Sequence, residues 1–188
     1  MKLFAALGNP GRKYINTRHN IAWLFVDFLQ RNFSFNWKEK FKGMYSQENI
    51  CGEKVIFLKP LTYMNLSGES VAAARDFFKV QTSNVLVVHD EIDLPFGQLA
   101  FKKGGGLAGH NGLKSIAERL STKDFYRLRL GVGRPQRGDV SSYVLSKFSR
   151  DEGIVLENYF KQTEEAFETF ISSGYEKAST AYNKKDLI

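Results

Sequence analysis

The sequence predicts an α/β fold: a single globular domain with a twisted mixed β-sheet flanked by helices. Short apolar runs typical of buried strands are interspersed with longer segments whose apolar residues recur every three or four positions, as in amphipathic helices. The 188 residues show neither an internal repeat nor a long linker, so we expect one domain, 1–188, around one core.

The elements expected in the first half follow from apolar periodicity and from turn residues. The first apolar run must end at Gly8-Asn9-Pro10-Gly11, a cluster that forms only turns or loops. Apolar residues recur with helical spacing after Thr17, a possible N-cap. Gly52-Glu53 separates two strand-like runs, as in a hairpin. The expected elements are a strand at 2–7, a helix at 17–29, a hairpin of 45–51 and 54–58, and a helix at 67–78.

The second half continues the alternation. Val85 to Val88 form a branched apolar run, consistent with a strand buried on both faces. Its carboxyl end carries His89-Asp90-Glu91, at the usual position for ligands in α/β sheets. Ser149 and Glu152 fit a capping box at the start of a long helix. The expected elements are strands at 85–88, 98–102 and 127–132, and helices at 111–120, 149–173 and 175–182.

Composition narrows the class of protein. The formal net charge of +7 and the pI near 9.4 favour polyanionic partners such as nucleic acid, although a solvated basic surface fits equally well. The single Cys51 excludes an internal disulfide and a four-ligand Cys/His zinc site, so we expect a cytoplasmic protein. The apolar N-terminal run is too short for a signal peptide or a membrane span.

Two sets of polar residues are candidates for chemistry. His19 and Asp90 follow two different strands, so both can lie at one edge of the sheet. A carboxylate partner fixes the tautomer of a histidine and stabilises its imidazolium, which suits general-base catalysis. Asn9, Asn65 and Asn111 lie in loop-forming contexts, where an amide can orient a carbonyl or stabilise an oxyanion. The alternative for each is a residue that caps a helix or a turn.

Other patterns leave alternatives open. Gly104 to Gly109 match the dinucleotide-binding pattern G-x-G-x-x-G. That pattern needs an acidic residue about twenty positions later at the carboxyl end of a strand, to bind the ribose, but Asp124 precedes a predicted strand. This favours a glycine hinge, or a loop that a bulky ligand can approach, over nicotinamide binding. Basic residues near these loops could bind the phosphates of a nucleic acid while Tyr14 and Tyr63 stack on its bases. The alternative is that they form a solvent-exposed basic surface. These cations are Arg12, Lys13, Arg18, Lys102, Lys103, Lys114, Arg127 and Arg129. A metal site without a tight signature is conceivable from His19, His89, Asp90, Asp93 and His110.

Several long motifs together resemble the bacterial peptidyl-tRNA hydrolase family, from Leu3 to about Leu145. In chain order they are Leu7–Gly11 with Tyr14, Thr17–Asn20, Pro60–Gly68, His89–Gly97, Gly104–Leu113 and Arg127–Pro135. The resemblance implies hydrolysis of the ester between a nascent peptide and the 3′-terminal ribose of tRNA, which frees the tRNA for translation. It implies peptidyl-tRNA as the partner, no metal or organic cofactor and no membrane, and we expect a monomer.

The resemblance also implies residue roles. His19 is the base that activates water, Asp90 holds its basic form, and Asn9 helps to distinguish N-blocked peptidyl ends from free aminoacyl ends. Asn111 is a candidate for positioning the water or the oxyanion. The substrate-binding positions are Tyr14, Tyr63, Asn65 and Asn111, and Lys102 with Arg129 is the pair that binds a tRNA phosphate.

Overall fold

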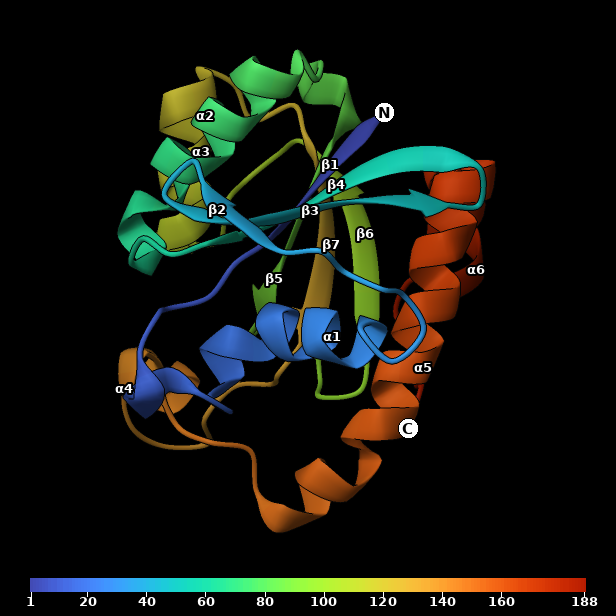
Figure 1. Cartoon of the computed structure of the whole chain (residues 1–188). Helices are drawn as coiled ribbons and strands as arrows, with labels where there is room; N and C mark the ends of the chain where they lie inside the picture. Colours follow the sequence, from blue (N-terminus) through green and yellow to red (C-terminus); the bar gives the residue numbers. More distant parts are fainter.

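The computed structural model describes all residues, 1–188, and confirms the α/β fold with a mixed sheet. The sheet has seven strands in the order β2-β3-β4-β1-β5-β7-β6 (Figure 1). The strands are β1 (Lys2–Ala6), β2 (Lys38–Lys40), β3 (Gly43–Ile50), β4 (Glu53–Pro60), β5 (Val85–Glu91), β6 (Leu99–Lys103) and β7 (Tyr126–Gly131). Strand β2 was not predicted, because its Lys-Glu-Lys sequence is exposed throughout and carries no apolar signal.

The parallel strands lie at the centre of the sheet. β1 pairs in parallel with β4 and β5, and β5 pairs in parallel with β7, while β2, β3 and β6 pair antiparallel with their neighbours. All residues of β5 are buried, as expected for a strand covered on both faces. The β3–β4 hairpin turns at Cys51 and Gly52, whose φ angles are 51° and 83°. A lone cysteine on a predicted strand is expected to be a small core residue, but Cys51 is instead an exposed turn residue.

Helices cover both faces of the sheet, and each face has its own apolar core. Helices α2 and α3 lie together on one face, and α1, α5 and α6 cover the other (Figure 1). The helices are α1 (Ile21–Leu29), α2 (Ser67–Phe78), α3 (Asn111–Leu120), α4 (Val140–Val144), α5 (Arg150–Ser173) and α6 (Tyr175–Tyr182). None of these helices combines the length and the apolar character that a membrane crossing requires.

Local sequence explains most helix boundaries. The capping box of Ser149 and Glu152 is present at the start of α5, and Gly174, with φ of 86°, ends that helix. Helix α1 begins at Ile21, because the residues after Thr17 form a separate 3₁₀ helix, η2 (Arg18–Asn20). Helix α4 was not predicted, since five residues carry too few turns for a periodicity to be recognised.

Helices α2 and α3 pack unusually closely, and one glycine permits this. A Cβ atom on Gly68 would lie 2.1 Å from the carbonyl oxygen of Ser115, so no larger residue fits there. The Gly68 amide donates to Ser115 Oγ at 2.9 Å, which ties the two helices together. Their N-terminal ends therefore have a fixed spacing beside the carboxyl ends of β1, β4 and β5.

Candidate active site

A cavity of about 660 Å³ lies where the segments following β1, β4 and β5 converge. Because parallel strands end at the same edge of a sheet, their following loops form a crevice there. The cavity brings together six of the predicted site residues, namely Asn9, His19, Tyr63, Asn65, Asp90 and Asn111. Helix α4 contributes the remaining wall with Val140, Ser141 and Val144, followed by Leu145.

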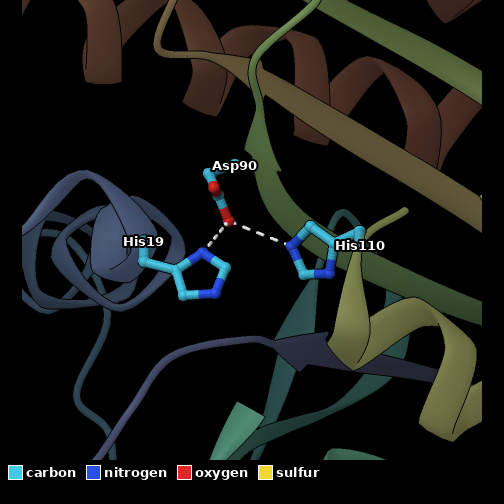
Figure 2. Close-up of side chains that lie close together, drawn as sticks. All are labelled: His19, Asp90 and His110. Carbon is cyan, nitrogen blue, oxygen red and sulfur yellow. Dashed lines mark hydrogen bonds and ion pairs between the residues drawn. The ribbon is translucent and has the colours of Figure 1, made fainter. Parts of the chain in front are cut away.

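One oxygen atom of Asp90 is shared by two histidines. His19 Nδ1 lies 2.8 Å from Asp90 Oδ1, and His110 Nε2 lies 3.0 Å from the same oxygen. Figure 2 shows the two imidazoles on either side of this carboxylate, His19 beside α1 and His110 at the start of α3. The Asp90 side chain is only 2% exposed, so these contacts are shielded from solvent.

The backbone fixes the protonation of His110. Its Nδ1 accepts hydrogen bonds from the amides of Gly112, at 3.1 Å, and Leu113, at 3.3 Å, so His110 acts as the N-cap of α3. A nitrogen that accepts two amide protons carries no proton of its own. The His110 proton is therefore on Nε2, which donates to Asp90 Oδ1.

Asp90 in turn sets the form of His19. A carboxylate acceptor at Nδ1 keeps the proton of neutral His19 on that nitrogen, so Nε2 carries the free lone pair. Burial disfavours the charged imidazole, but the charge and hydrogen bond of Asp90 outweigh burial and raise the pKa of His19 above 6.5. Burial also opposes the Asp90 carboxylate, yet the two histidines hold the pKa of Asp90 far below its usual range. His19 is thus a basic imidazole whose conjugate acid is stabilised.

His89 is the third histidine in the cavity wall, and it stays neutral. Burial, and secondarily His110, lower the pKa of His89 well below 6.5. Its Nδ1 is 2.7 Å from the Asp90 carbonyl oxygen, and its ring packs edge-on against His110. A neutral His89 adds no positive charge that would compete with His19 for Asp90.

The orientation of the Asn9 amide is fixed by the fold. Asn9 Oδ1 accepts the backbone amide of Met64 at 2.8 Å, and the Asn9 backbone exchanges two hydrogen bonds with the Asn20 side chain. With the oxygen occupied by a donor, the Nδ2 group is the free end of this amide, and Asn9 lines the cavity. The cavity therefore receives a hydrogen-bond donor from Asn9. Met64 and Asn20, which hold it, were not among the predicted site residues.

Tyr63, Asn65 and Asn111 line the same cavity and present accessible polar groups. Asn65 lies in the 3₁₀ helix η3 (Met64–Leu66) that follows β4, and Asn111 is the first residue of α3. Tyr63 is 56% exposed, and Asn65 and Asn111 are also exposed.

The predicted cationic residues lie outside the cavity. Lys102 on β6 faces Arg127 on β7, two positions before Arg129, so all three project from one face of the sheet. Arg129 is paired with Glu91 at 2.8 Å, and buried Arg127 donates to the carbonyl oxygens of Gly104 and Gly106. Burial lowers the pKa of Arg127.

Two other predicted residues occupy different surroundings. Tyr14, in the 3₁₀ helix η1 (Arg12–Tyr14), does not line the cavity, and the ammonium of Lys13 lies 4.8 Å from its ring centre. Arg18, which was considered with the phosphate-binding cations, is buried and paired with Glu152 at 2.7 Å. It is therefore not part of an exposed basic face.

Ligand atoms of His19, Asp90 and His110 lie within 4.8 Å of one another, a spacing that a metal site also has. The arrangement is that of a hydrogen-bonded group, because Asp90 Oδ1 accepts a hydrogen bond from each imidazole. Nδ1 of His110 is occupied by two backbone amides, so Nε2 carries its proton and has no free lone pair for a metal. His89 and Asp93, the other conceivable ligands, are outside this group.

Sequence reasoning gave His110 no catalytic part. The available signal was its place directly before a predicted helix, next to a glycine-rich loop, which is an N-cap position. Helix α4 carried no signal, because its contribution depends on a fold that returns residues 139–145 to the cavity.

Comparison with known proteins gives a consistent result. A family model of peptidyl-tRNA hydrolase matches residues 3–187. A peptidyl-tRNA hydrolase of Geobacter sulfurreducens is 43% identical over 188 residues, 100% of this chain and 97% of the relative. Its counterpart in Listeria welshimeri is 42% identical over 184 residues, 97% of this chain and 100% of the relative. The crystal structure of the Acinetobacter baumannii peptidyl-tRNA hydrolase matches with a TM-score of 0.89 at 34% identity, covering 98% of this chain and 97% of that one.

Proposed function

This chain belongs to the peptidyl-tRNA hydrolase family and is an enzyme of that class, and we propose that it uses a water molecule activated by His19. The bond cleaved is the ester between the peptide and the 3′-terminal ribose of peptidyl-tRNA. The observation that carries the proposal is the 2.8 Å contact between His19 Nδ1 and Asp90 Oδ1 in the cavity wall. It leaves His19 Nε2 as a proton acceptor beside bound substrate.

The reaction proceeds in two proton transfers. His19 Nε2 takes a proton from water as the water oxygen attacks the ester carbonyl carbon, and Asp90 stabilises the imidazolium that forms. The tetrahedral intermediate then breaks its bond to the ribose oxygen, which receives the proton back from His19. Asn111, at the cavity edge, is placed to donate to the oxyanion or to hold the water. An ester is reactive enough for this path without a covalent intermediate.

Asn9 supports selectivity for N-blocked substrates. Its free Nδ2 group is a donor, which suits the carbonyl oxygen of the amide that blocks the amino acid nitrogen. A free aminoacyl end instead carries an ammonium group, which can only donate hydrogen bonds. It would leave both the Asn9 Nδ2 group and the ammonium without an acceptor. Asn65 and Tyr63, on the same side of the cavity, complete the contacts to the acyl group and the terminal nucleotide.

The tRNA contacts lie outside the cavity. We assign the phosphate next to the acceptor end to Lys102 and Arg129, which share one face of the β6–β7 pair. Arg127, on the same face, donates to the Gly104 and Gly106 carbonyl oxygens and so holds the glycine-rich loop beside Lys102. Tyr14 is the remaining aromatic contact. We expect a monomer that works in the cytoplasm, where peptidyl-tRNA is made.

The test is release of tRNA from N-acetyl-aminoacyl-tRNA, with unblocked aminoacyl-tRNA as control and EDTA present throughout. We expect turnover of the blocked substrate alone, and a fall of about 10²–10⁴-fold in His19→Ala. Undiminished turnover by His19→Ala would contradict the water-activation mechanism. Equal turnover of the two substrates by the wild-type protein would contradict the role given to Asn9.

A further inference from the structure

Arg18, the residue before His19, has a buried guanidinium whose two terminal nitrogens both donate hydrogen bonds, while its Nε has no partner. Its side chain is 8% exposed, and Nη2 donates to both carboxylate oxygens of Glu152, at 2.8 and 2.7 Å. Nη1 donates to the carbonyl oxygen of Lys147 and lies 3.4 Å from Ser146 Oγ. A buried charge is stable only when it is paired and hydrogen-bonded in this way.

Two aromatic rings enclose the same guanidinium. The Arg18 Cζ atom lies 4.6 Å from the ring centre of Tyr143 and 5.1 Å from that of Phe148. A guanidinium can lie against aromatic rings and, through separate nitrogens, bond a carboxylate and a carbonyl at once, so lysine is a poor substitute here. These contacts span residues 143–152, from the end of α4 through the connecting segment to the first turn of α5.

The backbone reinforces the connection. The Arg18 amide donates to the Ser146 carbonyl at 3.0 Å, and Thr17 forms an isolated bridge with Lys147. Glu152 Oε2, which accepts from Arg18, also accepts the Ser149 amide at 2.6 Å in the capping box of α5. The start of α5 is therefore attached to the 3₁₀ helix η2 that carries His19.

Helix α4 depends on this attachment more than on any other packing. The element it contacts most is η2, and its Tyr143 hydroxyl makes one further bond, to the Val132 carbonyl at 2.7 Å. On its other side α4 faces the cavity, where Val140 and Leu145 remain 36% and 40% exposed. An apolar wall that stays uncovered in the free protein is available for the acyl part of a substrate.

We infer that Arg18 is a positioning residue that holds the α4 wall against the helix of His19, and thereby sets the affinity for the acyl part of the substrate. The inference rests on the proposed function. His19 has its own restraint in Asp90, so loss of Arg18 releases the wall without releasing the base. The effect therefore falls on KM and not on the proton transfer.

The experiment compares Arg18→Met, which keeps the length but removes the charge and the planar fork, with two other variants. Glu152→Gln removes the charge of the partner while its amide oxygen can still accept the Ser149 amide. The matched control is Arg31→Met, because Arg31 pairs with Glu157 of the same helix α5 but in an exposed position, with side chains 60% and 73% exposed. Circular dichroism and thermal melting establish that each variant is folded.

Three readouts separate the proposal from a general loss of stability. For Arg18→Met we expect KM for N-acetyl-aminoacyl-tRNA to rise about tenfold, with kcat and its pH dependence nearly unchanged. Inhibition by uncharged tRNA should be unchanged, because the wall contacts the acyl group. Hydrogen exchange of the amides of 140–148 should become several-fold faster, with that of β5 unaffected. Glu152→Gln should show the same changes to a smaller degree, and Arg31→Met none.

Unchanged KM and unchanged exchange at 140–148 in folded Arg18→Met or Glu152→Gln would overturn the inference. A fall in kcat with a shifted pH profile would also overturn it, because Arg18 would then act through His19. If Arg18→Met does not fold, Glu152→Gln decides the question alone. Absence of turnover by the wild-type protein would instead count against the proposed function, and the exchange experiment would still test the attachment of α4.

Discussion

Replacing Asp90 with asparagine is the most informative perturbation of the site, because it removes a charge with little change in shape. An asparagine can face His19 with its oxygen or with its NH₂ group. Both His19 Nδ1 and His110 Nε2 point donors at this position, and His110 is held in that form by two backbone amides. The amide oxygen of the introduced asparagine should therefore take the place of Asp90 Oδ1, and the tautomer of His19 should survive.

The magnitude then comes from charge alone. In the transition state His19 is becoming an imidazolium, and its hydrogen bond of 2.8 Å to Asp90 brings the two charges together. Two unit charges about 4 Å apart at an effective dielectric constant of about 20 attract by about 4 kcal/mol. Because each 1.36 kcal/mol is a factor of ten in rate, kcat should fall by about 10³-fold.

The pH profile provides an independent measurement. Protonated His19 cannot act as a base, and Asp90 raises the pKa of His19 above 6.5, so wild-type activity should fall as the pH drops through that raised value. In Asp90→Asn the negative charge that raises the pKa of His19 is lost, while burial, which lowers the pKa of His19, remains. The acid limb of kcat should move to lower pH in the variant even though the maximal rate is smaller.

The assay is single-turnover hydrolysis of N-acetyl-aminoacyl-tRNA from pH 5 to 9, and Asp93→Asn is the matched control. Asp93 is 44% exposed and pairs with Arg134 at the surface, so its substitution should leave both the rate and the acid limb intact. A loss of less than tenfold in Asp90→Asn, with the acid limb in its wild-type position, would refute the reasoning. It would mean that Asp90 orients His19 without supplying charge.

Three further predictions concern the rest of the molecule. Lys102→Ala or Arg129→Ala should raise KM and weaken its dependence on salt, with less effect on kcat, as measured by initial rates at several ionic strengths. Dialysis against EDTA should leave kcat unchanged, because the proposed activating group is His19; a loss restored by a divalent ion would contradict this. Gly68→Ala should lower the free energy of unfolding by about 1–3 kcal/mol in urea titrations, since the new Cβ would lie 2.1 Å from the Ser115 carbonyl oxygen; an unchanged midpoint would contradict that packing.

The sequence predicted the elements whose signals are local. The run at 85–88 and the capping box at Ser149 act within a few residues of chain, and both elements appear where expected. The parallel-sheet rule then places the segments after β1, β4 and β5 together, which is why Asn9, His19, Asn65 and Asp90 converge. Local pattern and general topology were sufficient for those positions.

Pairings between distant residues could not be predicted in the same way. Arg18 has the same appearance in the sequence as the other cations near the loops, and only its position opposite Glu152 makes it a buried anchor. The shared use of Asp90 by His110 depends on α3 starting beside β5. Strand β2 and helix α4 are too short for periodicity to reveal, so their placement is a consequence of the completed fold.

Backbone amides hold two polar groups of the site in place, Asn9 and His110. The Met64 amide determines which end of Asn9 faces the cavity, and the amides of Gly112 and Leu113 determine which nitrogen of His110 carries the proton. Through Asp90 that proton restricts His19 to one tautomer.

Backbone amides in packed helices cannot rotate as side chains do, so the donors and acceptors are oriented before substrate binds and need no reorganisation during the reaction. The close contact of α2 with α3 at Gly68 fixes the spacing between the elements that carry the Met64 and Gly112 amides. Substitutions that separate these helices should lower kcat even when every polar side chain of the site is retained.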